Sequence, residues 1–348
     1  MRALLTSLLL LGLLASTAAA GGSDEWKVYL ARHPEPGECH ALVKAGFNAA
    51  ADGENEAALK SLSKAEEDGC GAGDGLVLAR MAFLHRMANR PDESLSYYEK
   101  ALPKLEEQYA DNPARVLALY NLGYLHEQQG RTEKALESYR AALGVDPAFH
   151  NARTSLRGLL QRTAEQALDS GEPVRAAEFA AQALAVQDEI DAGLTVKETK
   201  GRQGVLLIAL RAAVATRNGK AAKGYHDRLL TDADAMIAIK VARIWAKAEM
   251  AEPAALAYQR AAELDPKDVS ALMALGELRE GQERWSDAAA AYKEAHERRP
   301  KNADILYALG YAHFSGGDYE RARQAFKKAL QIEPGHTAAK DALDQLGG

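Results

Sequence analysis

The sequence predicts an all-α solenoid of paired helices, and three observations support this prediction. First, residues of the same kind recur every 34 positions in the C-terminal third of the chain. Second, hydrophobic residues make up 47% of the chain and aromatic residues only 6%, with alanine abundant; small apolar residues favour closely packed helices over β-sheets. Third, glycine and proline interrupt the pattern at fixed places, as expected where helices end.

The recurring columns show what one unit contains. Two columns hold alanine: Ala254, Ala288 and Ala322, and Ala261, Ala295 and Ala329. One column holds an aromatic ring: Tyr258, Tyr292 and Phe326. The last two columns hold proline (Pro266, Pro300 and Pro334) and glycine (Gly276 and Gly310). In the last unit, apolar faces over 306–313 and 322–329 are separated by residues 316–318, two glycines and an aspartate. Each unit is therefore predicted to be an antiparallel helical hairpin that must stack on its neighbours to bury its apolar face.

This pattern resembles the tetratricopeptide repeat family. The units that match the family specifically begin near Val116, Val269 and Ala303. Weaker units begin near Cys39, Gly75 and Ala235, and degenerate units cover 157–188 and 205–230. The resemblance implies a right-handed superhelical solenoid of about eight antiparallel hairpins in two half-arrays.

The chain is predicted to contain five segments. These are a signal peptide (1–20), a lead-in segment (21–38), an N-terminal array (39–187), a polar linker (188–203) and a C-terminal array with a capping helix (204–348). Pro34 and Pro36 predict that the lead-in is extended. Wider repeat spacing predicts a lengthened second helix over 95–109, and a long helix or an extra turn over 150–168.

The N-terminus predicts export. Arg2 precedes an apolar stretch from Leu4 to Leu14, and small residues follow up to Ala20. This order is typical of a secretory signal peptide cleaved after Ala20. The alternative is an uncleaved anchor, but the stretch is barely long enough to span a bilayer and contains hydroxyl side chains. We therefore expect a mature protein without a stable membrane span, in the periplasm of a Gram-negative cell or secreted.

The two cysteines predict a disulfide. Cys39 begins the first helix of one unit, and Cys70 lies just before the first helix of the next. In a stack of hairpins these helix starts are neighbours, and export places them where disulfides persist. A bridge would contribute on the order of 3–4 kcal/mol. The alternative is a pair of free structural thiols.

Several functional classes are disfavoured. The net charge is −6, with both signs interspersed, so the concentrated basic face that nucleic-acid binding needs is absent from the sequence. His85, His126 and His313 occupy one repeat column, and equivalent repeat positions do not converge on one metal ion. No zinc-binding, dinucleotide-binding or phosphate-loop motif matches. The sequence predicts a protein that is not an enzyme and needs no metal or cofactor.

Aromatic rings recur along the first helices of the units. The rings of one N-terminal column are Phe47, Phe83 and Tyr124, and Tyr120 lies one turn before Tyr124. Near the C-terminus the rings at corresponding positions are Tyr307 and Tyr311. The resemblance implies that these helices line a concave groove. Rings there bury much area at little entropic cost when an extended peptide or amphipathic helix binds. The alternative is that the rings pack between neighbouring units.

Together these features predict an exported scaffold or adaptor that binds a peptide or partner domain, in envelope assembly or secretion. Flanking charges such as Arg86, Glu127, Arg243 and Glu277 would supply specificity. One alternative is an enzyme, or an enzyme-regulatory subunit, with a site in the degenerate region 150–230. Another is self-association through an uncapped end, which would give a structural oligomer.

Overall fold

The computed structural model describes residues 25–34, 37–71, 73–192 and 199–347. The predicted signal peptide, 1–20, lies outside these residues. The described residues form helices joined by turns, without a strand. The chain divides into two compact units, residues 1–159 (unit 1) and 160–348 (unit 2). This division falls inside a helix and not at the predicted linker, 188–203.

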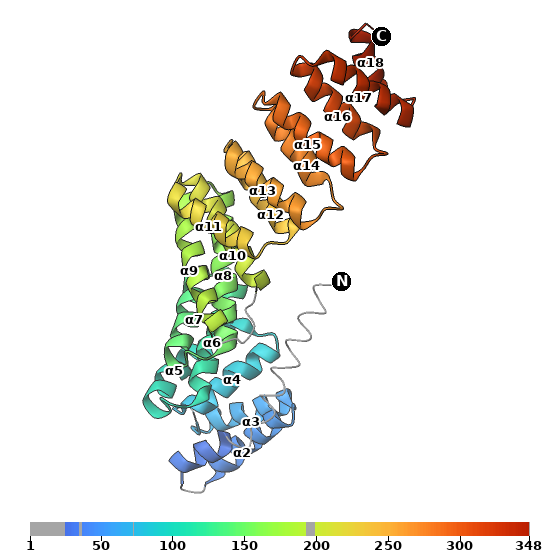
Figure 1. The fold of residues 1–348 in the computed structure, drawn as a ribbon. Helices are drawn as coiled ribbons and strands as arrows, with labels where there is room; N and C mark the ends of the chain where they lie inside the picture. Colours follow the sequence, from blue (N-terminus) through green and yellow to red (C-terminus); the bar gives the residue numbers. More distant parts are fainter. Residues whose placement is uncertain (1–24, 35–36, 72, 193–198, 348) are drawn as a thin grey trace. The chain divides into compact units, whose positions relative to one another are not determined.

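Unit 1 is a stack of helical hairpins (Figure 1). Its helices are α2 (Glu38–Ala51), α3 (Asn55–Glu67), α4 (Gly75–Met87), α5 (Pro91–Gln108), α6 (Pro113–Gln128), α7 (Thr132–Val145) and the first half of α8 (His150–Asp169). The pairs α2–α3, α4–α5 and α6–α7 pack most extensively. The lengthened helices are confirmed, since α5 has 18 residues and α8 has 20, against 14 in α7.

Unit 2 continues the hairpin pattern. It holds the rest of α8, then α9 (Pro173–Ala192), α10 (Thr199–Ala215), α11 (Gly219–Thr231), α12 (Ala235–Lys247), α13 (Ala251–Leu264), α14 (Ser270–Glu280), α15 (Trp285–Arg298), α16 (Ala303–Ser315), α17 (Tyr319–Ile332) and α18 (Thr337–Gln345). The pairs α12–α13, α14–α15 and α16–α17 are regular hairpins. The short helix α18 packs on the last hairpin through Ala339.

The glycine column and the aromatic column form one contact within each regular hairpin. A Cβ on Gly276 would lie 2.3 Å from the ring of Tyr292, and a Cβ on Gly310 would lie 2.6 Å from the ring of Phe326. Both rings are fully buried. Such separations are far below van der Waals contact, so only glycine lets the first helix approach the second this closely. The predicted close approach of the paired helices is confirmed.

The lead-in segment is helical, which corrects the predicted extended conformation. Residues 25–32 form a helix that ends before Pro34. Trp26 and Tyr29 lie three positions apart and share a helical face. Tyr29 is 3% exposed, and its ring lies 6.2 Å from that of Phe47 on α2. The prediction is wrong because the prolines restrict only their own neighbourhood, whereas the apolar face upstream has a surface to pack on.

The predicted linker, 188–203, is also mostly helical. Helices α9 and α10 cover all of it except 193–198, which lie outside the described residues. Asp191 is 4% exposed; its Oδ2 accepts a hydrogen bond from Arg202 Nε at 2.8 Å, and its Oδ1 accepts one from Gln187 Nε2 at 3.0 Å. Two of the polar residues that suggested a linker, Asp188 and Asp191, are therefore paired with Arg202 of α10, because a buried carboxylate needs partners.

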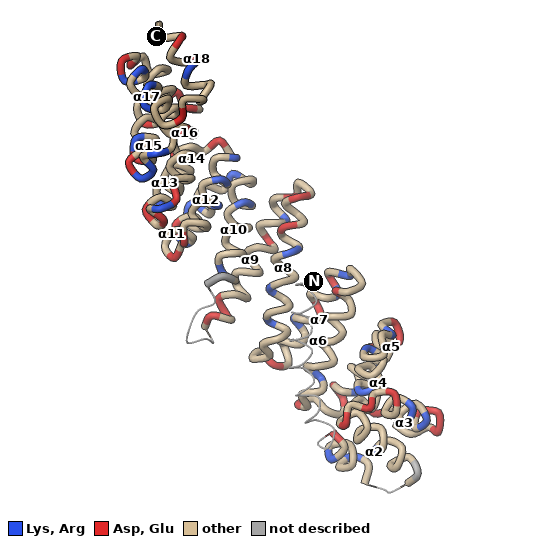
Figure 2. Tube along the Cα trace, turned by 90° about the vertical axis from the view of Figure 1, so that its right-hand side faces the viewer, with Lys and Arg blue, Asp and Glu red and all other residues tan. Residues whose placement is uncertain are grey.

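Charged residues of both signs are interleaved along the helices of both units (Figure 2). This agrees with the interspersed charges of the sequence. None of the helices in the described part of the chain is long and apolar enough to cross a bilayer.

Candidate partner-binding surface

Phe83 and Tyr124 occupy equivalent positions on the neighbouring helices α4 and α6, and both keep solvent exposure. Phe83 is half-buried, and Tyr124 is 38% exposed. Arg86 lies one turn after Phe83, with its Cζ 5.1 Å from the centroid of the Phe83 ring and 5.9 Å from that of Tyr124. Cation–π contacts to rings of two successive hairpins thus hold the guanidinium. We call these three residues the arginine–aromatic surface.

The charge of Arg86 is not neutralised within the described part of the chain. No carboxylate oxygen there lies within 4.0 Å of its nitrogens, and its Nε is buried without a hydrogen-bond partner. The nearby predicted specificity charge, Glu127, already accepts a hydrogen bond from Tyr139 Oη at 2.8 Å. The half-buried guanidinium keeps its positive charge, so the surface suits an acidic ligand.

Two of the predicted groove residues are buried, which corrects their assignment to an open surface. Phe47 has no exposed surface and packs on Tyr29 of the lead-in helix. Tyr120 is 9% exposed, with its ring 5.7 Å from that of Tyr139 and 5.5 Å from that of Phe149. The sequence could not show this, because Tyr29 and Phe149 belong to connecting segments outside the repeat columns.

In unit 2 the two predicted tyrosines on α16 differ in exposure. Tyr311 is 42% exposed, whereas Tyr307 is half-buried. The Tyr307 ring lies 5.9 Å from that of Phe326 and 5.3 Å from that of His336, which precedes α18. Tyr307 therefore helps to seat the terminal helix. Contact of Tyr311 with a partner stays a prediction.

A buried polar cluster anchors the start of α4. Asp74 is 2% exposed, and its Oδ1 caps the helix by accepting hydrogen bonds from the backbone nitrogens of Leu76 and Val77 at 2.8 and 3.2 Å. Its Oδ2 accepts a hydrogen bond from Tyr109 Oη at 2.5 Å and lies 3.0 Å from His33 Nε2. Burial, then the hydrogen bond to Asp74, raises the pKa of Tyr109, so the hydroxyl stays protonated. This cluster was not predicted; its one signal in the sequence is an aspartate directly before an apolar helix.

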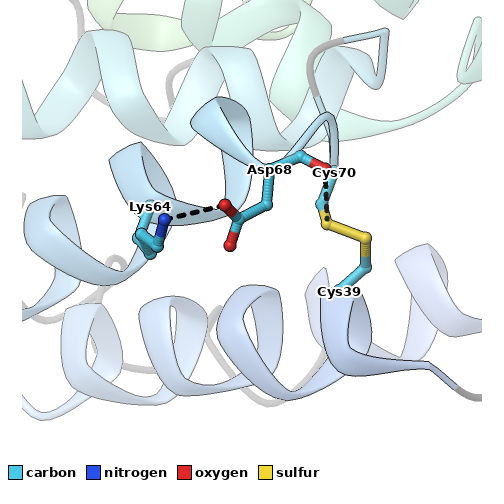
Figure 3. The surroundings of a disulfide bond; sticks show 4 residues. All are labelled: Cys39, Lys64, Asp68 and Cys70. Carbon is cyan, nitrogen blue, oxygen red and sulfur yellow. Dashed lines mark hydrogen bonds and ion pairs between the residues drawn. A yellow bond between two sulfur atoms is a disulfide. The ribbon is translucent and has the colours of Figure 1, made fainter.

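Cys39 and Cys70 form a disulfide (Figure 3). Their Cα atoms are 5.2 Å apart, and 31 positions separate them in sequence. Cys39 lies in the first turn of α2, and Cys70 lies between α3 and α4. The bond therefore ties the start of the first hairpin to the start of the second. Beside it, Lys64 Nζ pairs with Asp68 Oδ1 at 2.7 Å.

Three of the described histidines, His85, His126 and His226, are buried. Among the described residues, no three His, Cys, Asp or Glu side chains are grouped to hold a metal ion. His85 and His126 are 8% and 4% exposed, and burial lowers the pKa of each. His226 on α11 is 8% exposed, and its Nδ1 accepts a hydrogen bond from Trp245 Nε1 on α12 at 2.9 Å. This bond requires a neutral Nδ1, in keeping with the pKa of His226, which burial also lowers.

Acidification is expected to destabilise the fold through His226. Because its pKa in the folded chain lies below the ordinary 6.5, the unfolded chain takes up a proton first as the pH falls. The stabilisation is complete above pH 6.5 and is lost as the pH falls through the lowered pKa. Urea unfolding at about pH 7.5 and about pH 5.5 should give a lower midpoint at the lower pH, and His226→Gln should reduce the difference. An equal or higher midpoint at the lower pH would contradict this.

A cleft of ≈ 450 Å³ lies among α13, α14 and α15. Arg279 and Arg284 at its edge both pair with Glu252 Oε1 at 2.7 Å. The hydrogen bond from Arg279 lowers the pKa of Glu252, which is therefore ionised. The cleft lies outside 150–230, the region in which an enzyme site is the alternative prediction, and these charges satisfy one another.

Comparisons with known proteins agree with the repeat pattern. Family models described as tetratricopeptide repeat match residues 75–148, 251–295 and 273–337. Photosystem I assembly protein Ycf3 of Rippkaea orientalis is 35% identical over 79 residues, which are 23% of this chain and 43% of that protein. The match thus spans less than half of the relative's length.

Solved structures of tetratricopeptide repeat proteins are also similar. One from Parabacteroides merdae is 17% identical, covering 89% of this chain and 99% of that chain, with a TM-score of 0.37. The TPR2AB domain of yeast Sti1, in complex with pHSP90, is 16% identical, covering 88% and 96%, with a TM-score of 0.37. YrrB, a protein with an unusual peptide-binding site, is 18% identical, covering 70% and 98%, with a TM-score of 0.30.

The 34-residue columns, the glycine–ring contact that they encode and the matching family models lead to one conclusion. The chain belongs to the tetratricopeptide repeat family.

Proposed function

We propose that this protein is an exported scaffold that holds a partner by an acidic segment on the arginine–aromatic surface. Tetratricopeptide repeat proteins are protein–protein interaction scaffolds, and their fold is typically non-catalytic. The observation that carries the proposal is the state of Arg86, which is held between two rings without a carboxylate among the described residues. Its charge is already positioned, so a partner does not have to order it.

Each residue of the surface has a distinct part in binding. Arg86 would donate charge-assisted hydrogen bonds to a partner's Asp or Glu. Phe83 and Tyr124 would bury apolar atoms that flank this acid, since each ring offers a large area and few rotatable bonds. The partner segment is therefore expected to place an acidic residue beside an aliphatic or aromatic one.

Export is supported by two features of the sequence. The N-terminus has the charged start, apolar stretch and small-residue exit of a signal peptide. The bonded pair Cys39–Cys70 suits an oxidising compartment. Envelope assembly or secretion is the process proposed for such a scaffold in a Gram-negative cell.

A phage-displayed library of random short peptides, selected on the mature protein, tests the ligand chemistry. Selected peptides are expected to be enriched in Asp or Glu next to an apolar residue. Arg86→Gln should weaken binding of the selected peptides at least about tenfold, or about 1.4 kcal/mol. Tyr124→Ala should weaken it through lost apolar contact.

The matched control is Lys134→Gln, which removes the same charge from an exposed position on α7, a second helix of its hairpin. This variant should bind like the wild type. Peptides without acidic enrichment, or equal effects of Arg86→Gln and Lys134→Gln, would count against the proposal.

A further inference from the structure

The lead-in helix, 25–32, is held on unit 1 by a charge at its start and a ring at its centre. Arg80 on α4 is 8% exposed and pairs with the carboxylate of Glu25, its Nε donating a hydrogen bond to Glu25 Oε2 at 3.0 Å. One turn later, Tyr29 packs on Phe47 of α2. Arg80 lies one turn before Phe83, so the helix rests beside the arginine–aromatic surface and on the same first helices.

The other end of the lead-in helix presents cationic and hydrogen-bonding groups. Arg32 donates a hydrogen bond to the backbone oxygen of Gln108 at 2.6 Å, and its Cζ lies 5.1 Å from the centroid of the Tyr109 ring. His33 Nε2 lies 3.0 Å from Asp74 Oδ2. The surface beneath therefore runs from a cation at Arg80 to a carboxylate at Asp74, and the helix above it has the opposite order of charges.

Three features distinguish this helix from a repeat helix. It has no partner in the 34-residue pattern and precedes the first hairpin. The disulfide fixes the start of α2 to the α3–α4 turn without it. Its described part, 25–32, is held by contacts to α2 and α4, namely the Tyr29–Phe47 ring packing and the Glu25–Arg80 pair. The helix therefore depends on the surface, whereas the hairpins have their own core and cross-link.

We propose that the surface formed by Phe47, Arg80, Asp74 and Tyr109 is a helix-binding site that the chain fills with its own residues 25–34. Its ligand class is a short amphipathic helix with a carboxylate at its N-terminal end, a ring at its centre and a cation at its C-terminal end. A partner helix of this chemistry displaces residues 25–34. The site borders the arginine–aromatic surface, with the Arg80 Cζ 5.6 Å from the centroid of the Phe83 ring, but Arg86 is not part of it.

The charges also set the direction of the bound helix. A helix laid in the reverse direction would bring its cation to Arg80 and its carboxylate to Asp74, two like-charge contacts in partly buried surroundings. A peptide with the same composition in reversed order is thus expected to be excluded.

A labelled peptide of residues 23–37 tests the proposal on the full mature chain. In the wild type, the attached segment competes at an effective concentration near the millimolar range, so the added peptide should bind weakly. A variant with Glu25→Arg and Tyr29→Ala loosens the attached segment. This loosened variant is expected to bind the wild-type peptide at least about tenfold more tightly than the wild-type chain does, measured by fluorescence anisotropy.

Charge exchange identifies the site. Combining Arg80→Glu with Tyr29→Ala, with Glu25 kept in the attached segment, should abolish binding of the wild-type peptide, and a peptide carrying Glu25→Arg should restore it. Arg86→Gln in the loosened background should leave peptide binding unchanged. If it removes binding as fully as Arg80→Glu does, the peptide binds at the arginine–aromatic surface and the proposal is overturned.

Folding is checked for each chain by helical circular dichroism and cooperative unfolding. A loosened variant that folds like the wild type and binds no more tightly than the wild type overturns the proposal. If Tyr29→Ala impairs folding, Glu25→Arg alone provides the same comparison, because it leaves the Tyr29–Phe47 contact in place. Failure of the acidic-peptide selection with success of this assay would sink only the proposed function.

Discussion

Replacing both Cys39 and Cys70 with serine is expected to lower the free energy of unfolding by about 3–4 kcal/mol. The bond closes a loop of 31 positions and joins the starts of two successive hairpins, so without it the unfolded chain gains conformational freedom. The loss should fall on unit 1, which holds both cysteines. Denaturant unfolding of the double variant against the oxidised wild type measures the difference.

Reduction supplies the control for this comparison. The wild type in a strong reductant should unfold like the double variant, and the variant itself should not respond to the reductant. Intact mass of the exported protein should show two hydrogens fewer than the reduced chain. Rapid labelling of both thiols in the untreated protein would contradict the bonded pair.

Gly276→Ala is expected to lower the free energy of unfolding by about 1–3 kcal/mol. The new Cβ would lie 2.3 Å from the ring of Tyr292, which is 1% exposed and has no room to move. The strain must be relieved by parting α14 from α15, and this disturbs the contact that defines the repeat. Thermal or denaturant unfolding of unit 2 reports the loss.

The same substitution at an exposed glycine is the matched control. Gly224 on α11 is exposed, and a Cβ there would meet nothing within 4 Å. Gly224→Ala is therefore expected to stabilise the chain by about 0.5–1 kcal/mol, because alanine is the better helix former. Similar effects at both positions would show that propensity, and not the close approach, explains the glycine column.

The repeated part of the fold was predictable because each column records one contact made many times. Gly276 with Tyr292 and Gly310 with Phe326 are the same contact in successive hairpins, so their common spacing reports three-dimensional proximity. Features that occur once leave no such trace. The pairing of Asp191 with Arg202 is one of these, and its polar residues are typical of a linker when only the sequence is seen.

The candidate site was predictable only in part for the same reason. The repeat register placed Phe47, Phe83 and Tyr124 in one column, but exposure along that column depends on what covers each ring. Tyr29 covers Phe47, and the repeat pattern does not predict this contact. The register also cannot show that the Arg86 guanidinium lies between two rings from different hairpins, since this depends on the rotamer of a long side chain.

Partner binding on the arginine–aromatic surface is tested most directly by site-specific photo-crosslinking in the native cells. A photoreactive residue in place of Tyr124 is expected to capture a partner in a discrete adduct whose yield falls with Arg86→Gln. The same residue in place of Lys134 on α7 should give none. An adduct at position 134 with none at 124 would place the partner on the second helices of the hairpins and contradict binding at the arginine–aromatic surface.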